Sequence, residues 1–288
     1  MVDKKPYIPK EWEEVSCMFC NSDESKIYHK YGNELQFTYV LCVNCRLVYQ
    51  SPRPKYNEEF LEAAYGRYFM YNSDYKYNQK ELAIFNEELL EITKFDNRKS
   101  LILDIGSAMG AFLKVSMDYY QKSVGLDVSK IMAEFSRKEL GIEVFNEKFE
   151  DFNYGEKFSC IHMSHVIEHI PNPSEWLARA KQLMDPEGIL VIAVPNMFSF
   201  TRVLKLFLRR IGLKSGKWKE NWRTPDHLFE PTVPSMLAFL RSNNFEILDY
   251  YSYSRKNMTS KGRISYIFNR KLNWGSNLRF YAKVKNAL

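Results

Sequence analysis

The sequence predicts an α/β fold, in which a seven-stranded, mostly parallel sheet carries helices on both faces and follows a small cysteine-rich module. Three observations lead to this prediction. From residue 101 onward, short apolar segments alternate with segments of helical periodicity, the pattern of parallel β-α-β units. A loop of small residues, Gly106-Ser-Ala-Met-Gly110, follows the first apolar segment. Two Cys-x-x-Cys pairs lie near the start of the chain.

The individual elements follow from hydrophobic periodicity and from residues that end helices. We expect strands near 100–105, 122–127, 143–146, 158–163, 188–194, 245–253 and 278–284. We expect helices near 110–119, 129–140, 174–184 and 232–242. Gly188 and the pair Asn243-Asn244 stand where helix C-caps belong.

Three regions divide the chain. Residues 1–55 form the cysteine-rich module, which ends at Ser51-Pro-Arg-Pro54 because two prolines interrupt regular structure. Residues 56–98 are expected as a helical linker, and residues 99–288 as the main domain. Pro195-Asn196 opens a long insertion over 196–230 within the main domain.

The four paired cysteines are candidate metal ligands. They are Cys17, Cys20, Cys42 and Cys45. Two Cys-x-x-Cys pairs in a chain without an export signal favour metal binding over disulfides. Four thiolates give a closed tetrahedral zinc site, so we expect a structural Zn²⁺ that holds together a module too small to fold alone. Cys160 lies in a predicted strand and is expected in the core.

Composition sets the class of protein. Of 288 residues, 45% are hydrophobic and 26% are charged, as in a soluble globular protein. The net charge of +6 is too mildly basic to favour nucleic acid as a partner. No segment approaches the roughly 18 apolar residues of a membrane-spanning helix. The polar start of the chain lacks a secretion signal, so we expect a cytoplasmic protein. Nothing in the sequence predicts an oligomeric state.

The loop at 106–110 has the chemistry of a nucleotide-binding turn. Gly106 and Gly110 allow a ligand to approach the backbone closely, and the helix that follows offers free N–H donors. Asp127 ends the next predicted strand, where a carboxylate can accept hydrogen bonds from the hydroxyls of an adenosine ribose. Asp104 precedes the loop, where its charge suits a cationic amino group better than a pyrophosphate.

These residues resemble motif I of class I S-adenosylmethionine (SAM) dependent methyltransferases, written D-x-G-x-G-x-G. The segment 124–129 looks like their ribose-binding motif, and 186–195 looks like the region of their fifth strand. The chain departs from the pattern at Ala108, Lys148 and Ser159. The resemblance implies a Rossmann-like methyltransferase (EC 2.1.1.-) with SAM as cofactor. The expected cofactor-binding residues are Asp104, Gly106, Ser107, Gly110, Asp127, Val128, Phe149 and Ser164.

A polar segment at 163–173 supplies candidate catalytic residues. His165, Glu168 and His169 are spaced three and four apart, which places them together on a short helical turn. A histidine suits proton removal near neutral pH, and a carboxylate can orient it. The wording H-x-x-E-H is also similar to one large methyltransferase subgroup, where it implies a position near the transferred methyl group. Two alternatives stay open: the residues buttress the loop, or the histidines bind a metal.

The insertion supplies the fourth catalytic candidate, His227. The segment 222–229 resembles the His-Leu segment of the same methyltransferase subgroup, in which such an insertion covers the acceptor. A role for His227 as a loop anchor is the alternative. The cysteine pairs, the segment 47–54 and the tyrosines at 65, 68 and 71 resemble zinc-ribbon methyltransferases that modify sugars and glycans. This resemblance implies a small carbohydrate acceptor, with the tyrosines either closing over it or packing the linker.

Other functions compete with sugar methylation. The segment 200–211 predicts a basic amphipathic helix, which either packs on its own domain or contacts an anionic membrane surface as in a quinone or lipid O-methyltransferase. An RNA methyltransferase would use the cysteine module and the basic segments to grip its substrate. A non-enzymatic zinc-bearing interaction module is the third alternative.

Overall fold

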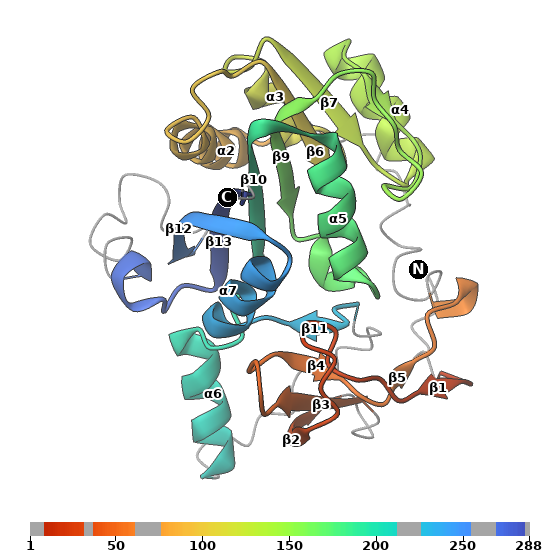
Figure 1. The fold of residues 1–288 in the computed structure, drawn as a ribbon, viewed down its shortest axis with the longest axis vertical. Coiled ribbons are helices and arrows are strands. Elements are labelled where there is room, and N and C mark those ends of the chain that lie inside the picture. Colours follow the sequence, from red (N-terminus) through yellow and green to blue (C-terminus); the bar gives the residue numbers. More distant parts are fainter. Residues whose placement is uncertain (1–8, 32–36, 61–75, 212–225, 255–268, 286–288) are drawn as a thin grey trace.

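The computed structural model describes residues 9–31, 37–60, 76–211, 226–254 and 269–285. A large sheet flanked by helices forms one part, and a smaller cysteine-bearing sheet lies beside its helix α7 (Figure 1). Among the described residues, no helix is long and apolar enough to span a membrane.

The large sheet has the seven strands that the sequence predicts. They are β6 (Leu101–Ile105), β7 (Lys122–Leu126), β8 (Val144–Phe145), β9 (Phe158–Ser164), β10 (Met184–Pro195), β12 (Phe245–Tyr253) and β13 (Asn277–Val284). Their order is β12-β13-β10-β9-β6-β7-β8. Five neighbouring strands of this sheet pair in parallel, in the order β10-β9-β6-β7-β8. Strand β13 pairs antiparallel with both β10 and β12. This arrangement confirms the Rossmann-like fold class.

Alternate residues of the central strands build the core on both faces of the sheet. Leu101, Leu103 and Ile105 pack in one buried cluster, whereas Ile102 belongs to the cluster on the opposite face. Helices α2 (Gln79–Ile92) and α3 (Ala111–Ser116) pack in the second cluster. Helices α5 (Pro173–Leu183) and α7 (Val233–Ser242) pack in the first.

The helix ends test the expected caps. Asn243 caps α7 and Asn244 follows in the left-handed conformation, with φ of 61°, as expected. The expectation for Gly188 is wrong. Helix α5 ends at Leu183, and Gly188 lies inside β10, where an added Cβ would approach the carbonyl oxygen of Phe158 to 2.8 Å. Close packing of two strands, and not a helix end, therefore requires this glycine.

The cysteine-rich module shares a sheet with the main domain. The sheet contains β2 (Ser25–Tyr31), β3 (Phe37–Cys42), β4 (Val48–Gln50) and β11 (Phe229–Glu230), in the order β11-β4-β3-β2. Strands β1 (Trp12–Glu13) and β5 (Arg53–Pro54) pair separately. Because β11 belongs to the predicted insertion, the module is joined to the main domain by strand pairing. Phe19 of the module also stacks on Phe239 of α7, with ring centroids 3.9 Å apart.

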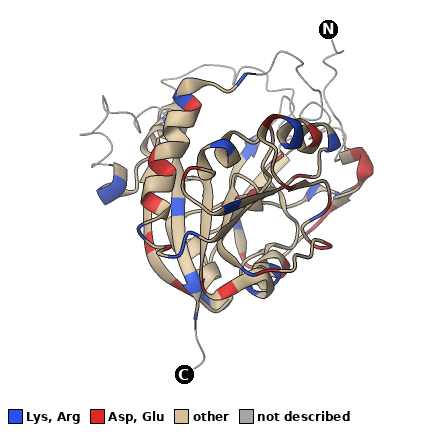
Figure 2. Ribbon diagram, turned by 90° about the horizontal axis from the view of Figure 1, so that it is seen from above, with Lys and Arg blue, Asp and Glu red and all other residues tan. Residues whose placement is uncertain are grey.

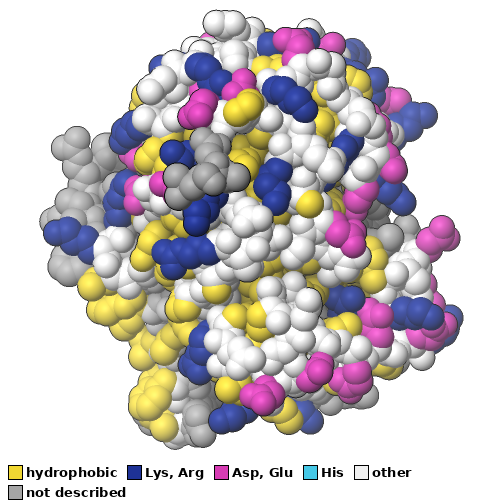
Figure 3. Space-filling model, in the orientation of Figure 1, with side chains coloured by type: hydrophobic (Ala, Val, Ile, Leu, Met, Phe, Trp, Pro, Cys, Tyr) yellow, Lys and Arg dark blue, Asp and Glu magenta, His cyan; other side chains and the backbone are white. Residues whose placement is uncertain are grey.

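Helix α6 (Phe200–Arg210) bears the predicted apolar stripe. Five large apolar residues of this stripe are 41–57% exposed: Phe200, Val203, Leu204, Phe207 and, directly after the helix, Ile211. Figure 3 shows hydrophobic side chains gathered at the lower left, over this helix. The tyrosines at 65, 68 and 71 lie outside the described residues.

Candidate functional site

The glycine loop makes a tight turn at the carboxyl end of β6. Gly106, Ala108 and Gly110 have φ of 73°, 47° and 78°, all in the left-handed region. The backbone N–H groups of Gly106 and Ser107 both donate to the carbonyl oxygen of Leu126, at 2.8 and 3.1 Å. The turn is thereby fixed against the end of β7, next to Asp127.

Asp127 connects this loop to helix α4 (Lys130–Leu140). Its Oδ2 accepts from the N–H of Ala108 and its Oδ1 accepts from the N–H of Ser129, each at 2.8 Å. Burial raises the pKa of Asp127, and the two N–H donors oppose that shift. The structure thus brings Asp127 onto the loop, and Val128 beside it is exposed.

Asp104 carries a partner that the sequence analysis missed. A hydrogen bond of 2.7 Å joins its Oδ1 to Nδ1 of His162 on β9. His162 Nε2 lies 3.1 Å from Glu88 of α2, and Glu88 lies 2.6 Å from Arg279 of β13. The available signal was a histidine and an arginine in otherwise apolar predicted strands, since such residues are rarely buried without partners.

Burial and partners act in opposite directions on His162. Burial alone would lower the pKa of this side chain, but its hydrogen bonds to Asp104 and Glu88 outweigh burial and raise the pKa to about 9. Burial raises the pKa of Asp104, while His162 opposes that shift. These four buried side chains comprise two cationic groups, His162 and Arg279, and two anionic groups, Asp104 and Glu88, so their charges compensate one another inside the fold.

The remaining cofactor candidates are Ser107, Ser164 and Phe149. Among the described residues, the buried Oγ of Ser107 has no hydrogen-bond partner, and it lies close to Gly125 of β7. A Cβ added at Gly106 would lie 2.5 Å from the side chain of Val166, so the segment after β9 packs directly on the loop. Ser164 ends β9 at this edge. Phe149 is buried against Trp176, and its stacking on an adenine ring stays a prediction.

The predicted catalytic residues meet at the same edge of the sheet. His165 follows β9 with φ of 57°, an unusual conformation for a non-glycine residue, and leads into the short helix η2 (Ile167–His169). Its Nδ1 lies 3.3 Å from Oε1 of Glu168, which is completely buried. Burial would raise the pKa of Glu168, but the close contact with His165 and the charges of the nearby histidines lower it.

His227 joins this cluster from a distant part of the chain. Its ring lies against that of His169, with centroids 4.8 Å apart. Its Nδ1 lies 3.0 Å from Oε1 of Glu230, and Arg202 of α6 binds both oxygens of the same carboxylate, at 2.7 and 3.0 Å. Burial alone would lower the pKa of His227, but Glu230 raises it to about 9.

The cysteine module holds the cluster in place. The backbone oxygen of His227 accepts hydrogen bonds from Gln50 Nε2 at 2.7 Å and from Tyr39 Oη at 3.2 Å. On the other side, the N–H of Leu228 donates to the backbone oxygen of Glu168. The segment around His227 therefore lies between the module and the end of β9. Sequence spacing could not predict this contact.

The four predicted metal ligands converge. The Sγ atoms of Cys17, Cys20, Cys42 and Cys45 all lie within 4.8 Å of one another. Each pair is followed by a residue in the left-handed conformation, Asn21 or Arg46, whose N–H donates back to the carbonyl oxygen of the first cysteine. The two turns thus repeat one geometry, which directs four thiols to a common point as a tetrahedral ion requires.

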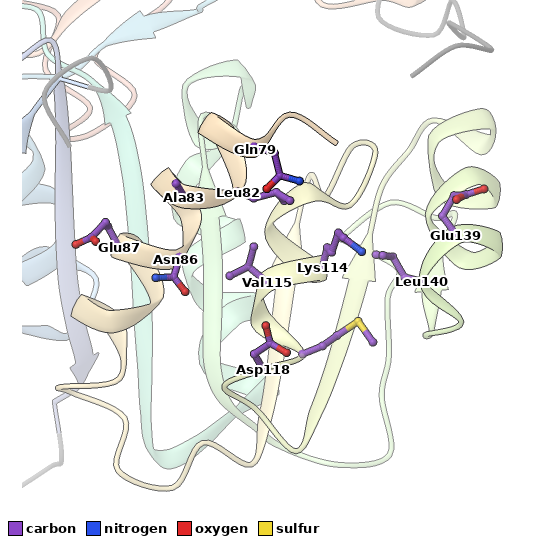
Figure 4. Close-up of a pocket in the computed structure, with 11 residues that line it drawn as sticks. Gln79, Leu82, Ala83, Asn86, Glu87, Lys114, Val115, Asp118, Glu139 and Leu140 are labelled. Atoms are coloured by element: carbon purple, nitrogen blue, oxygen red, sulfur yellow. The ribbon is translucent and has the colours of Figure 1, made fainter. Parts of the chain in front are cut away.

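A separate surface hollow of about 640 Å³ lies away from these residues, between α2, α3 and α4 (Figure 4). Lys114, Val115 and Asp118 of the α3 region line its floor, with Asn86 and Leu140 on either side. None of the predicted site residues lines it. The hollow therefore does not correspond to the site at the strand ends.

Comparison with known proteins agrees with the geometry. A family described as "Methyltransferase domain" matches residues 75–250. The ubiquinone biosynthesis O-methyltransferase of Bartonella tribocorum is 30% identical over 122 residues, which cover 39% of this chain and 47% of that protein. The chain thus spans about half the length of such curated relatives.

Two solved structures share the fold. A SAM-dependent methyltransferase from Clostridium acetobutylicum has a TM-score of 0.52 at 11% identity, covering 74% of this chain and 94% of that one. The 1,6-didemethyltoxoflavin-N1-methyltransferase of Burkholderia thailandensis, solved with S-adenosylhomocysteine, has a TM-score of 0.50 at 14% identity over 70% of this chain and 79% of that one. Because the family match spans more than half of the sequence, this chain belongs to the family of methyltransferase domains.

Proposed function

We propose that the protein is a SAM-dependent methyltransferase that binds its cofactor between the glycine loop and Asp127. The observation that carries this proposal is the hydrogen bond of 2.8 Å from the Ala108 N–H to Asp127 Oδ2, because it holds beside the loop a carboxylate of the kind that accepts hydrogen bonds from a ribose. The bound S-adenosylhomocysteine of the Burkholderia thailandensis neighbour supports SAM as the cofactor.

The chain offers residues for each part of the cofactor. Asp127 has acceptor capacity beyond its two backbone bonds, since an ionised carboxylate has about four lone-pair sites. The unpartnered Oγ of Ser107 and the backbone of Gly106 and Gly110 suit the amino-acid portion and the sulfonium side. SAM supplies an activated methyl group, and the protein contributes by positioning the acceptor in line with it.

We assign proton removal from the acceptor to His165, oriented by Glu168. The pair resembles a base and its orienting carboxylate, with 3.3 Å between His165 Nδ1 and Glu168 Oε1. His227 is a poorer base, because its Nδ1 is held by Glu230, which Arg202 binds in turn. His169 and His227 instead line the acceptor side of the cluster.

For the acceptor, we propose a hydroxylated quinone-type ring with an apolar tail. The names of the curated relatives support this class over the sugar that the N-terminal resemblance implies. Helix α6 supports it as well, because its apolar face is exposed while its Arg202 is tied to Glu230 and thus to His227. An exposed apolar face of this kind binds apolar groups, which a carbohydrate acceptor does not offer.

We also infer that Cys17, Cys20, Cys42 and Cys45 bind a structural Zn²⁺. Their closed four-thiol set leaves no open position for a substrate, so the ion stabilises the module that positions His227. An RNA acceptor is less well supported, since Lys/Arg and Asp/Glu are intermixed along the described helices and strands (Figure 2).

Two measurements test the proposal. Isothermal titration of zinc-loaded protein with SAM should show one binding event, and its absence would reject the cofactor. Methyl transfer from labelled SAM should then be measured to a short-chain catechol-type quinol and to a panel of nucleotide sugars. Transfer to the quinol alone supports the proposed acceptor, and transfer to a sugar alone restores the carbohydrate alternative.

A further inference from the structure

A second group of metal-type donors lies at the acceptor end of the site, separate from the cysteines. One donor atom from each of Glu168, His169 and His227 lies within 4.8 Å of the others. Glu168 comes from η2 after β9, and His227 from the segment before β11. Two imidazoles and a carboxylate are a ligand set that first-row divalent metal ions take in proteins.

Both histidines of this group make the hydrogen bond through Nδ1 that metal-binding histidines commonly make through their second ring nitrogen. His169 Nδ1 lies 2.7 Å from the carbonyl oxygen of Asp226, and His227 Nδ1 lies 3.0 Å from Glu230 Oε1. An Nδ1 that donates to an oxygen carries the proton of a neutral ring, and the lone pair then lies on Nε2. Metal-bound histidines typically make such a bond through their other nitrogen, to a carbonyl or a carboxylate.

The buried carboxylate of Glu168 is an independent indication that a cation binds here. Its side chain is completely buried, yet neither carboxylate oxygen has a well-aligned hydrogen bond among the described residues. A buried carboxylate without such bonds is costly, whereas a carboxylate that coordinates a cation is compensated. His165 lies at ion-pair distance from Oε1 alone, so Oε2 has no comparable neighbour in this cluster.

We propose that Glu168, His169 and His227 bind a first-row divalent transition-metal ion. The two histidines are half-buried and Glu168 is buried, so the site is closed on the protein side and reachable from the acceptor side. Three protein ligands leave at least one position open in a tetrahedral or larger coordination sphere. The open position suits an oxygen ligand.

A consequence for the reaction rests on the proposed function. An acceptor hydroxyl bound to this ion would have a lowered pKa and would pass its proton to His165 more readily. The carbon–sulfur bond of SAM breaks as the carbon–oxygen bond forms, and the proton leaves on the histidine. Hydroxylated rings with adjacent oxygens would fill the open positions best.

Cobalt titration of the zinc-loaded protein tests the site without using activity. With zinc already on the cysteines, Co²⁺ should bind with one further equivalent, seen by calorimetry and by visible absorption that lacks thiolate-to-cobalt bands. The variants His227→Gln and Glu168→Gln each remove a proposed ligand and should weaken cobalt binding by at least the roughly 10- to 100-fold that loss of a hydrogen-bond partner of a ligand costs. Glu187→Gln makes the same substitution at an exposed glutamate of β10 outside the cluster and should leave the affinity unchanged.

The outcomes separate this inference from the proposed function. No cobalt binding by the wild-type protein, or equal binding by wild type and both cluster variants, would overturn the metal site. SAM titration of the same samples reports the cofactor independently, and far-UV circular dichroism checks that each variant is folded. Cobalt binding without SAM binding would retain the metal site and reject methyl transfer, and the reverse result would do the opposite.

Discussion

His162 Nδ1 lies 2.7 Å from Oδ1 of Asp104, so a buried imidazole on β9 holds the carboxylate that precedes the glycine loop on β6. The two strands are neighbours in the parallel sheet, with Asp104 directly opposite His162 in the register. Glu88 and Arg279 extend the contact to α2 and β13. The loop is thereby tied to three elements outside its own β-α unit.

Replacing His162 with leucine should destabilise the fold strongly. The substitution leaves Asp104 without its partner and leaves Glu88 with Arg279 alone, and an uncompensated buried charge costs about 3–5 kcal/mol. The free energy of unfolding, measured with urea, should fall by this amount. Met163→Leu is a volume-conserving change on the same strand and should cost less than about 1.5 kcal/mol. Equal losses for the two variants would contradict the assigned role.

Stability should decrease as the pH rises from near 6.5 to 9. The pKa of His162 is about 9 in the folded protein, against about 6.5 in an unfolded chain, so the folded state holds the extra proton in this window. Its stabilisation is complete below pH 6.5 and is lost through pH 9, a change on the order of 3 kcal/mol. Asp104, Glu88 and Arg279 are the charged groups that face the ring. Unfolding free energies at pH 6, 7.5 and 9 should show this slope. His162→Gln should remove its own share and leave the share of His227, whose pKa is also about 9.

Most of the fold could be predicted from the sequence because local patterns determine it. The seven strands of the large sheet lie where apolar segments occur, and the ends of α4 and α7 coincide with good caps at Ser129 and Asn243. The prediction of a helix C-cap at Gly188 is wrong, because the sequence alone does not distinguish a glycine that ends a helix from a glycine that closely packed strands require. Only the packing of its neighbours distinguishes the two.

The site could be predicted in part. The loop and Asp127 follow from spacing along one β-α-β unit, which is local information. The contact of His169 with His227, and the pairing of β11 with β4, depend on tertiary packing between segments far apart in the chain. The Glu88–His162 contact had one visible signal, an ionisable residue in an apolar strand, but no signal for its partner.

Ala108→Gly should preserve or raise stability. Ala108 has φ of 47°, in a region that costs an L-residue with a Cβ about 1–2 kcal/mol, and glycine avoids this strain. The greater freedom of glycine in the unfolded chain offsets about 0.5–1 kcal/mol of that gain. We expect a net change between zero and about +1.5 kcal/mol in thermal or urea unfolding, with SAM affinity retained. A clear loss of stability would show that the Ala108 methyl group makes a necessary contact.

Asp127→Asn should weaken SAM binding more than it weakens the fold. The amide keeps one acceptor oxygen for the backbone but loses the charge-assisted bonds to a ribose, a loss of about 1–3 kcal/mol and therefore about 5- to 150-fold in Kd. Calorimetric titration measures this change directly. Asp118→Asn makes the same change of charge at the hollow of Figure 4 and should leave the Kd unaltered. An unchanged Kd for Asp127→Asn would move the cofactor away from β7.

Removing zinc should release the cysteine module and, with it, the His227 segment. The four thiols join the two turns of the module at one point, and β11 depends on β4 of this module for its strand pairing. Incubation with a strong chelator should make Cys17, Cys20, Cys42 and Cys45 react quickly with a thiol reagent, whereas Cys160 is buried in β9 and should stay unreactive until the main domain unfolds. The variant Cys160→Ala should therefore show the same rapid phase.

Two outcomes of the thiol reaction would contradict this prediction. Four fast-reacting thiols before chelation would mean that the cysteines carry no ion, and a slow reaction after chelation would mean that packing alone holds the module. Cobalt affinity at the histidine cluster should fall together with zinc loss, because Gln50 and Tyr39 then no longer hold the backbone of His227.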